Sequence, residues 1–86
     1  MTIRITLFGA LREADSSGEL ELPLPAGGTV ADLRRHLTDY LGKHAPDISP
    51  GLVRRSAFAT DKTVLRDSDA VPEVDSLAIL PPVSGG

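Results

Sequence analysis

The amino-acid sequence predicts an α+β domain in which one main helix packs on one face of a mixed β-sheet. Two segments near the start, 2–8 and 19–24, alternate apolar and polar residues, as half-buried strands do. Segment 30–41 instead has apolar residues three and four positions apart, which is typical of an amphipathic helix. The apolar run 77–80 has the length of a strand, and we place it inside the sheet.

The first two strands are expected to pair as a hairpin. The segment between them, 9–18, begins with Gly9 and is mostly polar, so we interpret it as a turn region. Pro23 has no backbone N–H to donate to a neighbouring strand. The second strand should therefore lie at a sheet edge, or Pro23 near its end.

The helix is expected to begin after Thr29 and to stop near Gly42. A threonine can cap a helix N-terminus, and Asp32, three residues later, suits the first turn. Glycine is common just beyond a helix C-terminus. The side chains expected to pack on the sheet are Val30, Leu33, Leu37 and Leu41.

The second half is expected to be less regular. Segment 43–51 contains two prolines and is predicted to be a loop. Segment 52–65 is predicted to be a strand ending near Thr60, a turn at Asp61 and Lys62, and a short extended piece. The element order is that of a β-grasp, the ubiquitin-like roll. We expect residues 1–80 to form this domain and residues 81–86 an extended C-terminal tail.

The composition excludes several classes of function. The chain has 86 residues, a net charge of −3 and only 3% aromatic residues, so it lacks the basic face and stacking side chains of nucleic-acid binders. It has no cysteine and no apolar stretch of about 18 residues, so we expect neither disulfides nor a membrane span. With no secretory signal visible, the cytoplasm is the expected compartment.

No self-contained catalytic or metal site is expected. His36 and His44 lack the four-residue spacing of a helical metal pair. The glycines of "PAGGTV" lack the Lys-Ser/Thr of a phosphate-binding loop, and Ser16 and Ser17 have no base at a sensible spacing. The core of so short a chain could hardly shelter an active site.

The second half is rich in acidic residues, for which two interpretations remain open. "DSD" resembles part of a calcium loop but lacks its glycine and closing glutamate. The carboxylates are either a solvated surface or a patch that steers a basic partner. These residues are Asp61, Asp67, Asp69, Glu73 and Asp75.

The ending "PPVSGG" follows directly on the last strand. Pro81 and Pro82 favour an extended backbone, so the tail should leave the domain stiffly and reach at most about 20 Å. Glycine allows close backbone approach, so Gly85 and Gly86 could enter a narrow tunnel in another protein. A terminal carboxylate becomes reactive once it is activated, for example as an acyl-adenylate. The alternative is a frayed, inert terminus.

Three segments together resemble the small subunit of molybdopterin synthase, the MoaD-like sulfur carriers related to the thiamine-pathway ThiS-like carriers. These are "ITLFGALRE", "GGTVADLRRHL" and above all "LAILPPVSGG". The resemblance implies that an E1-like enzyme adenylates Gly86 with ATP and that a sulfurtransferase supplies sulfur for a thiocarboxylate. It also implies sulfur donation to precursor Z in a synthase formed with a large subunit, where the catalytic residues are expected. The implied partner-binding residues are Gly85, Ser84, Val83, Pro82 and Pro81.

The resemblance implies no cofactor or metal on this chain, and three other functions stay open. One is sulfur transfer for thiamine, cysteine or tRNA thiolation, although the double proline favours the molybdopterin pathway. Another is a ubiquitin-like modifier attached to lysines. The last is an interaction domain with an inert tail.

Overall fold

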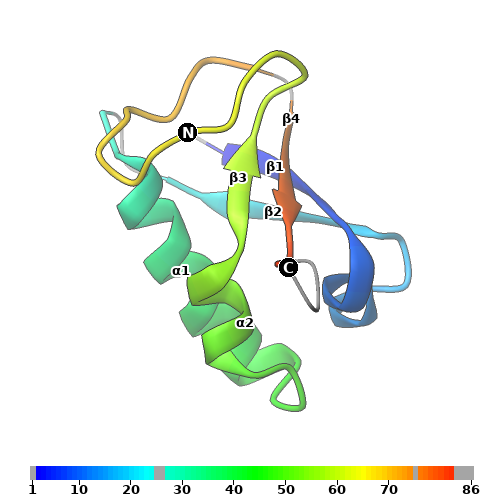
Figure 1. The fold of residues 1–86 in the computed structure, drawn as a ribbon. Coiled ribbons are helices and arrows are strands. Elements are labelled where there is room, and N and C mark those ends of the chain that lie inside the picture. Colours follow the sequence, from blue (N-terminus) through cyan, green and yellow to red (C-terminus); the bar gives the residue numbers. More distant parts are fainter. Residues whose placement is uncertain (1, 25–26, 75, 83–86) are drawn as a thin grey trace.

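The computed structural model describes residues 2–24, 27–74 and 76–82 (Figure 1). Its helices and strands follow the predicted order, with one short additional helix on either side of the main helix. Along the chain they are β1 (Thr2–Leu7), the 3-10 helix η1 (Gly9–Ala14), β2 (Glu19–Pro23), α1 (Val30–His44), α2 (Pro50–Arg55), β3 (Ala57–Ala59) and β4 (Ser76–Leu80).

The four described strands form one mixed sheet in the order β2-β1-β4-β3. β1 pairs antiparallel with β2 and parallel with β4, whereas β3 pairs antiparallel with β4. The last strand therefore lies inside the sheet, as predicted. β2 is an edge strand that ends at Pro23, which agrees with the expectation for that proline.

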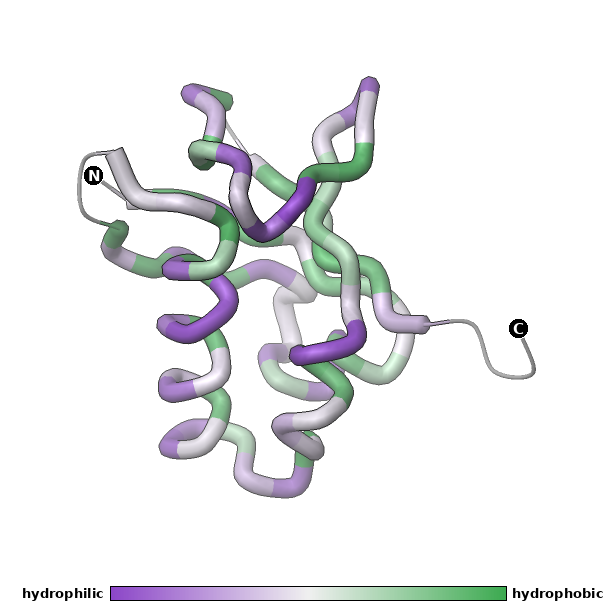
Figure 2. Tube along the Cα trace, turned by 60° about the vertical axis from the view of Figure 1, so that its left-hand side comes forward, coloured by the Kyte–Doolittle hydropathy of each residue, from purple (hydrophilic) through white to green (hydrophobic). Residues whose placement is uncertain are grey.

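A single apolar core lies between the sheet and the helices. The inward residues of β1, Ile3, Ile5 and Leu7, are at most 2% exposed. Along α1, hydrophobic and hydrophilic positions alternate with the turns of the helix (Figure 2). All four residues of the predicted stripe are buried, which confirms the face on which α1 packs: Val30, Leu33, Leu37 and Leu41.

The start of α1 is capped as expected, but its end is not where the sequence placed it. The Thr29 side chain accepts a hydrogen bond from the Asp32 N–H, and the Asp32 carboxylate accepts one from the Thr29 N–H. The helix passes through Gly42 and ends at His44. Gly42 does not have the positive φ with which a glycine ends a helix, so the prediction of a glycine stop was wrong.

Two predictions for residues 43–65 were also wrong. Residues 50–55 form α2, because Ser49 caps the helix by accepting a hydrogen bond from the Gly51 N–H. Pro50 lies in the first turn, where a missing N–H costs nothing. The expected strand is thus reduced to β3, and the extended piece after it to one bridge between Ala59 and Val64.

The turn region between β1 and β2 contains the 3-10 helix η1, which buries Leu11 completely. The loop after β3 is attached to the start of α1: the Val30 and Ala31 N–H groups donate to the Asp69 and Asp67 carbonyls. None of the helices in the described ranges has both the length and the apolar character needed to cross a bilayer.

Candidate functional site

The tail begins where β4 leaves the centre of the sheet. Ile79 pairs with Leu7 of β1, and Leu80 pairs with Ala57 of β3. Pro81, which follows, is half-buried, and Pro82 is exposed. The root of the tail therefore starts between the end of β1 on one side and the start of β3 on the other.

Gly9 lies against this root. A Cβ atom on Gly9 would lie 2.8 Å from Cγ of Pro81, closer than real Cβ contacts. The φ of Gly9 is +58°, a conformation that glycine adopts without steric cost. Glycine thus allows the first proline of the tail to pack against the backbone where η1 begins. The sequence analysis treated Gly9 only as a turn residue and missed this contact.

The remaining predicted site residues lie outside the described residues. They are the thiocarboxylate position Gly86 and the tail residues Val83, Ser84 and Gly85. Their roles stay predictions. Of the predicted partner-binding residues, the structure describes Pro81 and Pro82, at the end of β4.

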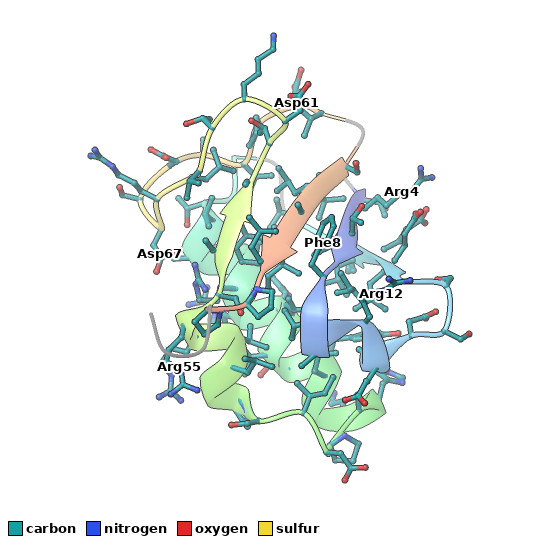
Figure 3. The ribbon with its side chains drawn as sticks, turned by 45° about the vertical axis from the view of Figure 1, so that its right-hand side comes forward. Arg4, Phe8, Arg12, Arg55, Asp61 and Asp67 are labelled. Atoms are coloured by element: carbon teal, nitrogen blue, oxygen red, sulfur yellow. The ribbon has the colours of Figure 1, made fainter. Side chains whose placement is uncertain are left out.

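The sheet face opposite the helices has apolar side chains beside the tail root. Phe8 is 43% exposed and Leu80 38% exposed. Phe8 has the same parity along the strand as the outward residues Arg4 and Thr6, and that parity could have indicated its exposure. Figure 3 shows Phe8 on this face, with Asp61 at the far end and Arg12, a residue of η1, beside it. We call this surface the open face.

A shallow hollow of about 630 Å³ lies on the open face. Its floor is a row of small side chains from three neighbouring strands, because Thr6 pairs with Ala78 and Ala78 pairs with Ala59. Its lining also includes Phe8, Thr60, Asp61, Glu73, Val74 and Ser76.

The acidic residues of the second half differ in their roles. The Asp67 carboxylate accepts from Nη2 of Arg34 at 2.8 Å, and the Asp69 carboxylate accepts from the Arg66 N–H at 2.8 Å. These two carboxylates make contacts within the fold. Asp61 and Glu73 line the hollow instead, and Asp75 lies outside the described residues.

Other candidate groups have structural explanations. Hydrogen bonds from the Thr29 N–H and then the Thr29 hydroxyl lower the pKa of Asp32, which reflects its capping role. His44 stacks on Tyr40 with ring centroids 4.2 Å apart. In the part of the chain that the structure describes, no three His, Asp or Glu side chains are grouped so as to hold a metal ion.

Comparison with known proteins agrees with the family resemblance on which the sequence analysis relied. The sequence model of the ThiS family matches residues 5–86. The molybdopterin synthase sulfur carrier subunit of Synechococcus elongatus is 39% identical over 92 aligned positions, which cover all of both chains.

Two solved structures have the same fold. SAMP1 from Haloferax volcanii gives a TM-score of 0.68 at 24% identity and covers 100% of both chains. A crystal structure of small archaeal modifier protein 1, also from H. volcanii, gives 0.68 at 22% identity and covers 95% of this chain and 98% of that one. At these identities the likeness shows the fold, the ubiquitin-like β-grasp that the sequence predicted.

Proposed function

This chain belongs to the ThiS family, and we propose that it is the sulfur carrier subunit of a molybdopterin synthase, with Gly86 as the thiocarboxylate position. The observation that supports this proposal best is the full-length 39% identity to a molybdopterin synthase sulfur carrier subunit. The position of Pro81 and Pro82, directly after the central strand β4, is consistent with a tail that projects from a rigid base.

The proposed chemistry takes place on the terminal carboxylate. In an E1-like enzyme, a carboxylate oxygen of Gly86 attacks the α-phosphorus of ATP and pyrophosphate leaves. Hydrosulfide then attacks the acyl carbon; where a sulfurtransferase persulfide is the source, a thiol first reduces the persulfide and releases its outer sulfur as hydrosulfide. AMP leaves and a proton is released, which gives the thiocarboxylate. The carrier contributes the reacting group, and its partners contribute the catalytic residues and the ATP site.

The domain contributes binding and orientation. A tail that enters a tunnel must start from a fixed point, and Gly9 packed against Pro81 limits the directions in which it can leave. The half-exposed side chains of Phe8 and Leu80 flank that point and suit an interface core. We therefore propose that the adenylating enzyme and the large subunit both contact the open face and the tail.

The test is thiocarboxylate formation by three tail variants. One has a single residue added after Gly86, one lacks Gly86, and one is Gly85→Ala. Adding or removing a residue displaces the carboxylate by about 3.5 Å, and a Cβ at position 85 obstructs close backbone approach. We expect all three to lose thiocarboxylate formation, the first two most, with thermal stability unchanged.

The reaction contains the adenylating enzyme of the same organism, ATP and sulfide, and is followed by the oxygen-for-sulfur mass change at the C-terminus. A tail-extended chain that still gains sulfur, without being trimmed, would refute the proposal. A second measurement reconstitutes the synthase with the large subunit and precursor Z. Sulfur transfer there supports the molybdopterin pathway, whereas covalent attachment to lysines of other proteins would identify a modifier instead.

A further inference from the structure

We propose that the hollow on the open face binds one long basic side chain, an arginine or a lysine, from the protein that receives the tail. The proposal rests on the proposed function, because it concerns the partners of the same tail. It assigns a specific chemistry to a part of the surface that is separate from the tail.

The shape of the hollow suits the stem of such a side chain. The floor residues Thr6, Ala59 and Ala78 are small, so a partner side chain can lie flat on the sheet. Phe8, 43% exposed, and Val74, 39% exposed, contribute apolar walls. The methylene stem of an arginine or lysine covers apolar surface of this kind while its charged end reaches a polar rim.

The charge of the hollow suits the head group. Among the described residues of its lining, the charged ones are Asp61 and Glu73, and both are acidic. Among the residues that the structure describes, neither carboxylate forms an ion pair or a side-chain hydrogen bond. Lys62 follows Asp61 in the sequence but is not part of the lining. Within the described ranges, these two negative charges beside a floor of small side chains therefore have no cationic partner.

Other occupants fit less well. A purely apolar side chain would remove water from Asp61 and Glu73 without pairing them, which is costly. A bound metal ion would need further ligands, and the described residues offer no group of three. An arginine can pair its planar guanidinium with a carboxylate while its methylene stem lies along the apolar walls, so arginine fits the hollow best.

The hollow lies close enough to the tail root for a contact there to orient the partner relative to the tail. Ala78 precedes Pro81 by three residues, which places the floor about 10 Å from the tail root along β4. A basic side chain seated there fixes the partner at a second point close to the tunnel entrance. Two separated points determine an orientation, whereas a tail alone leaves the partner free to rotate around it.

The first experiment removes the charge and keeps the shape. The double variant Asp61→Asn with Glu73→Gln is compared with Asp39→Asn with Asp47→Asn, which changes net charge equally at exposed positions of α1 and the loop after it. Steady-state kinetics with the adenylating enzyme, and calorimetric binding to the large subunit, are measured at 50 and 500 mM salt. We expect KM and Kd to rise about tenfold at low salt and less at high salt, with kcat unchanged.

A second variant, Ala78→Leu, fills the hollow without changing charge. We expect a similar loss of affinity that does not depend on salt, with circular dichroism confirming the fold. The assignment is refuted if both hollow variants behave like the Asp39/Asp47 control with both partners. A wild-type chain that forms no thiocarboxylate would instead contradict the proposed function, so the two failures are distinguishable.

Discussion

Replacing Arg34 by alanine should destabilise the domain more than removing any exposed ion pair. The side chain of Arg34 is only 14% exposed, and its guanidinium joins three parts of the chain. Nη1 donates to the carbonyls of Val53 and Ser56, which flank the C-terminal end of α2. Nε and Nη2 both donate to one oxygen of Asp67, and the guanidinium lies 5.2 Å from the centre of the Phe58 ring.

The contacts differ in their expected contribution. The Asp67 side chain is 59% exposed, so solvent screening limits that pair to about 1 kcal/mol or less. The contact with the ring adds about 0.5–1 kcal/mol. The largest effect is at the carbonyls: Ser56 is buried, and a buried acceptor left without a partner costs about 1–3 kcal/mol. We expect Arg34→Ala to cost about 2–4 kcal/mol.

The assay is equilibrium unfolding in guanidinium chloride, followed by far-ultraviolet circular dichroism because the chain has no tryptophan. In a separate thermal melt, the melting temperature should fall by more than about 8 °C, because 1 kcal/mol corresponds to roughly 4–8 °C for a domain of this size. Arg34→Lys keeps the charge but loses the planar fork, so it should recover only part of the loss. Asp67→Asn, which removes the exposed pair alone, should cost less than about 1 kcal/mol. Equal losses for Arg34→Ala and Asp67→Asn would refute the role assigned to the carbonyl contacts.

Further predictions concern the core, the helix cap and the tail root. Leu37→Ala should cost about 2–5 kcal/mol, since Leu37 is fully buried, and a loss below about 0.5 kcal/mol would contradict that placement. Hydrogen bonds from Thr29 lower the pKa of Asp32 below 3.8 in the folded state. The ionised carboxylate therefore stabilises the fold above pH 3.8, and this stabilisation is lost as the pH falls through the lower pKa of the folded state. In Asp32→Asn, the melting temperature should therefore fall less steeply as the pH is lowered. Gly9→Ala should raise the KM for adenylation, whereas Gly42→Ala, where a Cβ has open space, should stabilise the fold by up to about 1 kcal/mol and leave KM unchanged. Equal KM values for the two glycine variants would refute the role of Gly9.

The sequence predicted the elements that have a long periodic pattern. α1 and the first two strands were found because each buries a regular set of apolar residues. Segment 52–55 was misread because two adjacent apolar residues, Leu52 and Val53, fit a strand and a short helix equally well. The start signals of that helix, Ser49 and Pro50, were present but were interpreted as a loop.

The candidate site was predictable only in part. The distinctive composition of the C-terminal segment led to the hypothesis that Gly86 is the reacting position, and this hypothesis stays a prediction because residues 83–86 lie outside the described residues. The hollow could not be predicted, because its floor combines Thr6, Ala59 and Ala78 from strands that are far apart in the sequence. The sequence also does not show which acidic residues line the hollow, because some of them form contacts within the fold instead. Asp67 is held by Arg34, whereas Asp61 is not paired in the described structure.

The parallel pairing of β1 with β4 brings together segments from opposite ends of the described chain. Such pairing requires closure of a very long loop, so the centre of the sheet forms only when nearly the whole domain folds. An unfolded chain has the same six C-terminal residues but neither a hollow nor a fixed tail root. If the proposed function holds, an activating enzyme that binds both features would adenylate folded carriers in preference to unfolded ones, and ATP would not be consumed on chains unable to deliver sulfur.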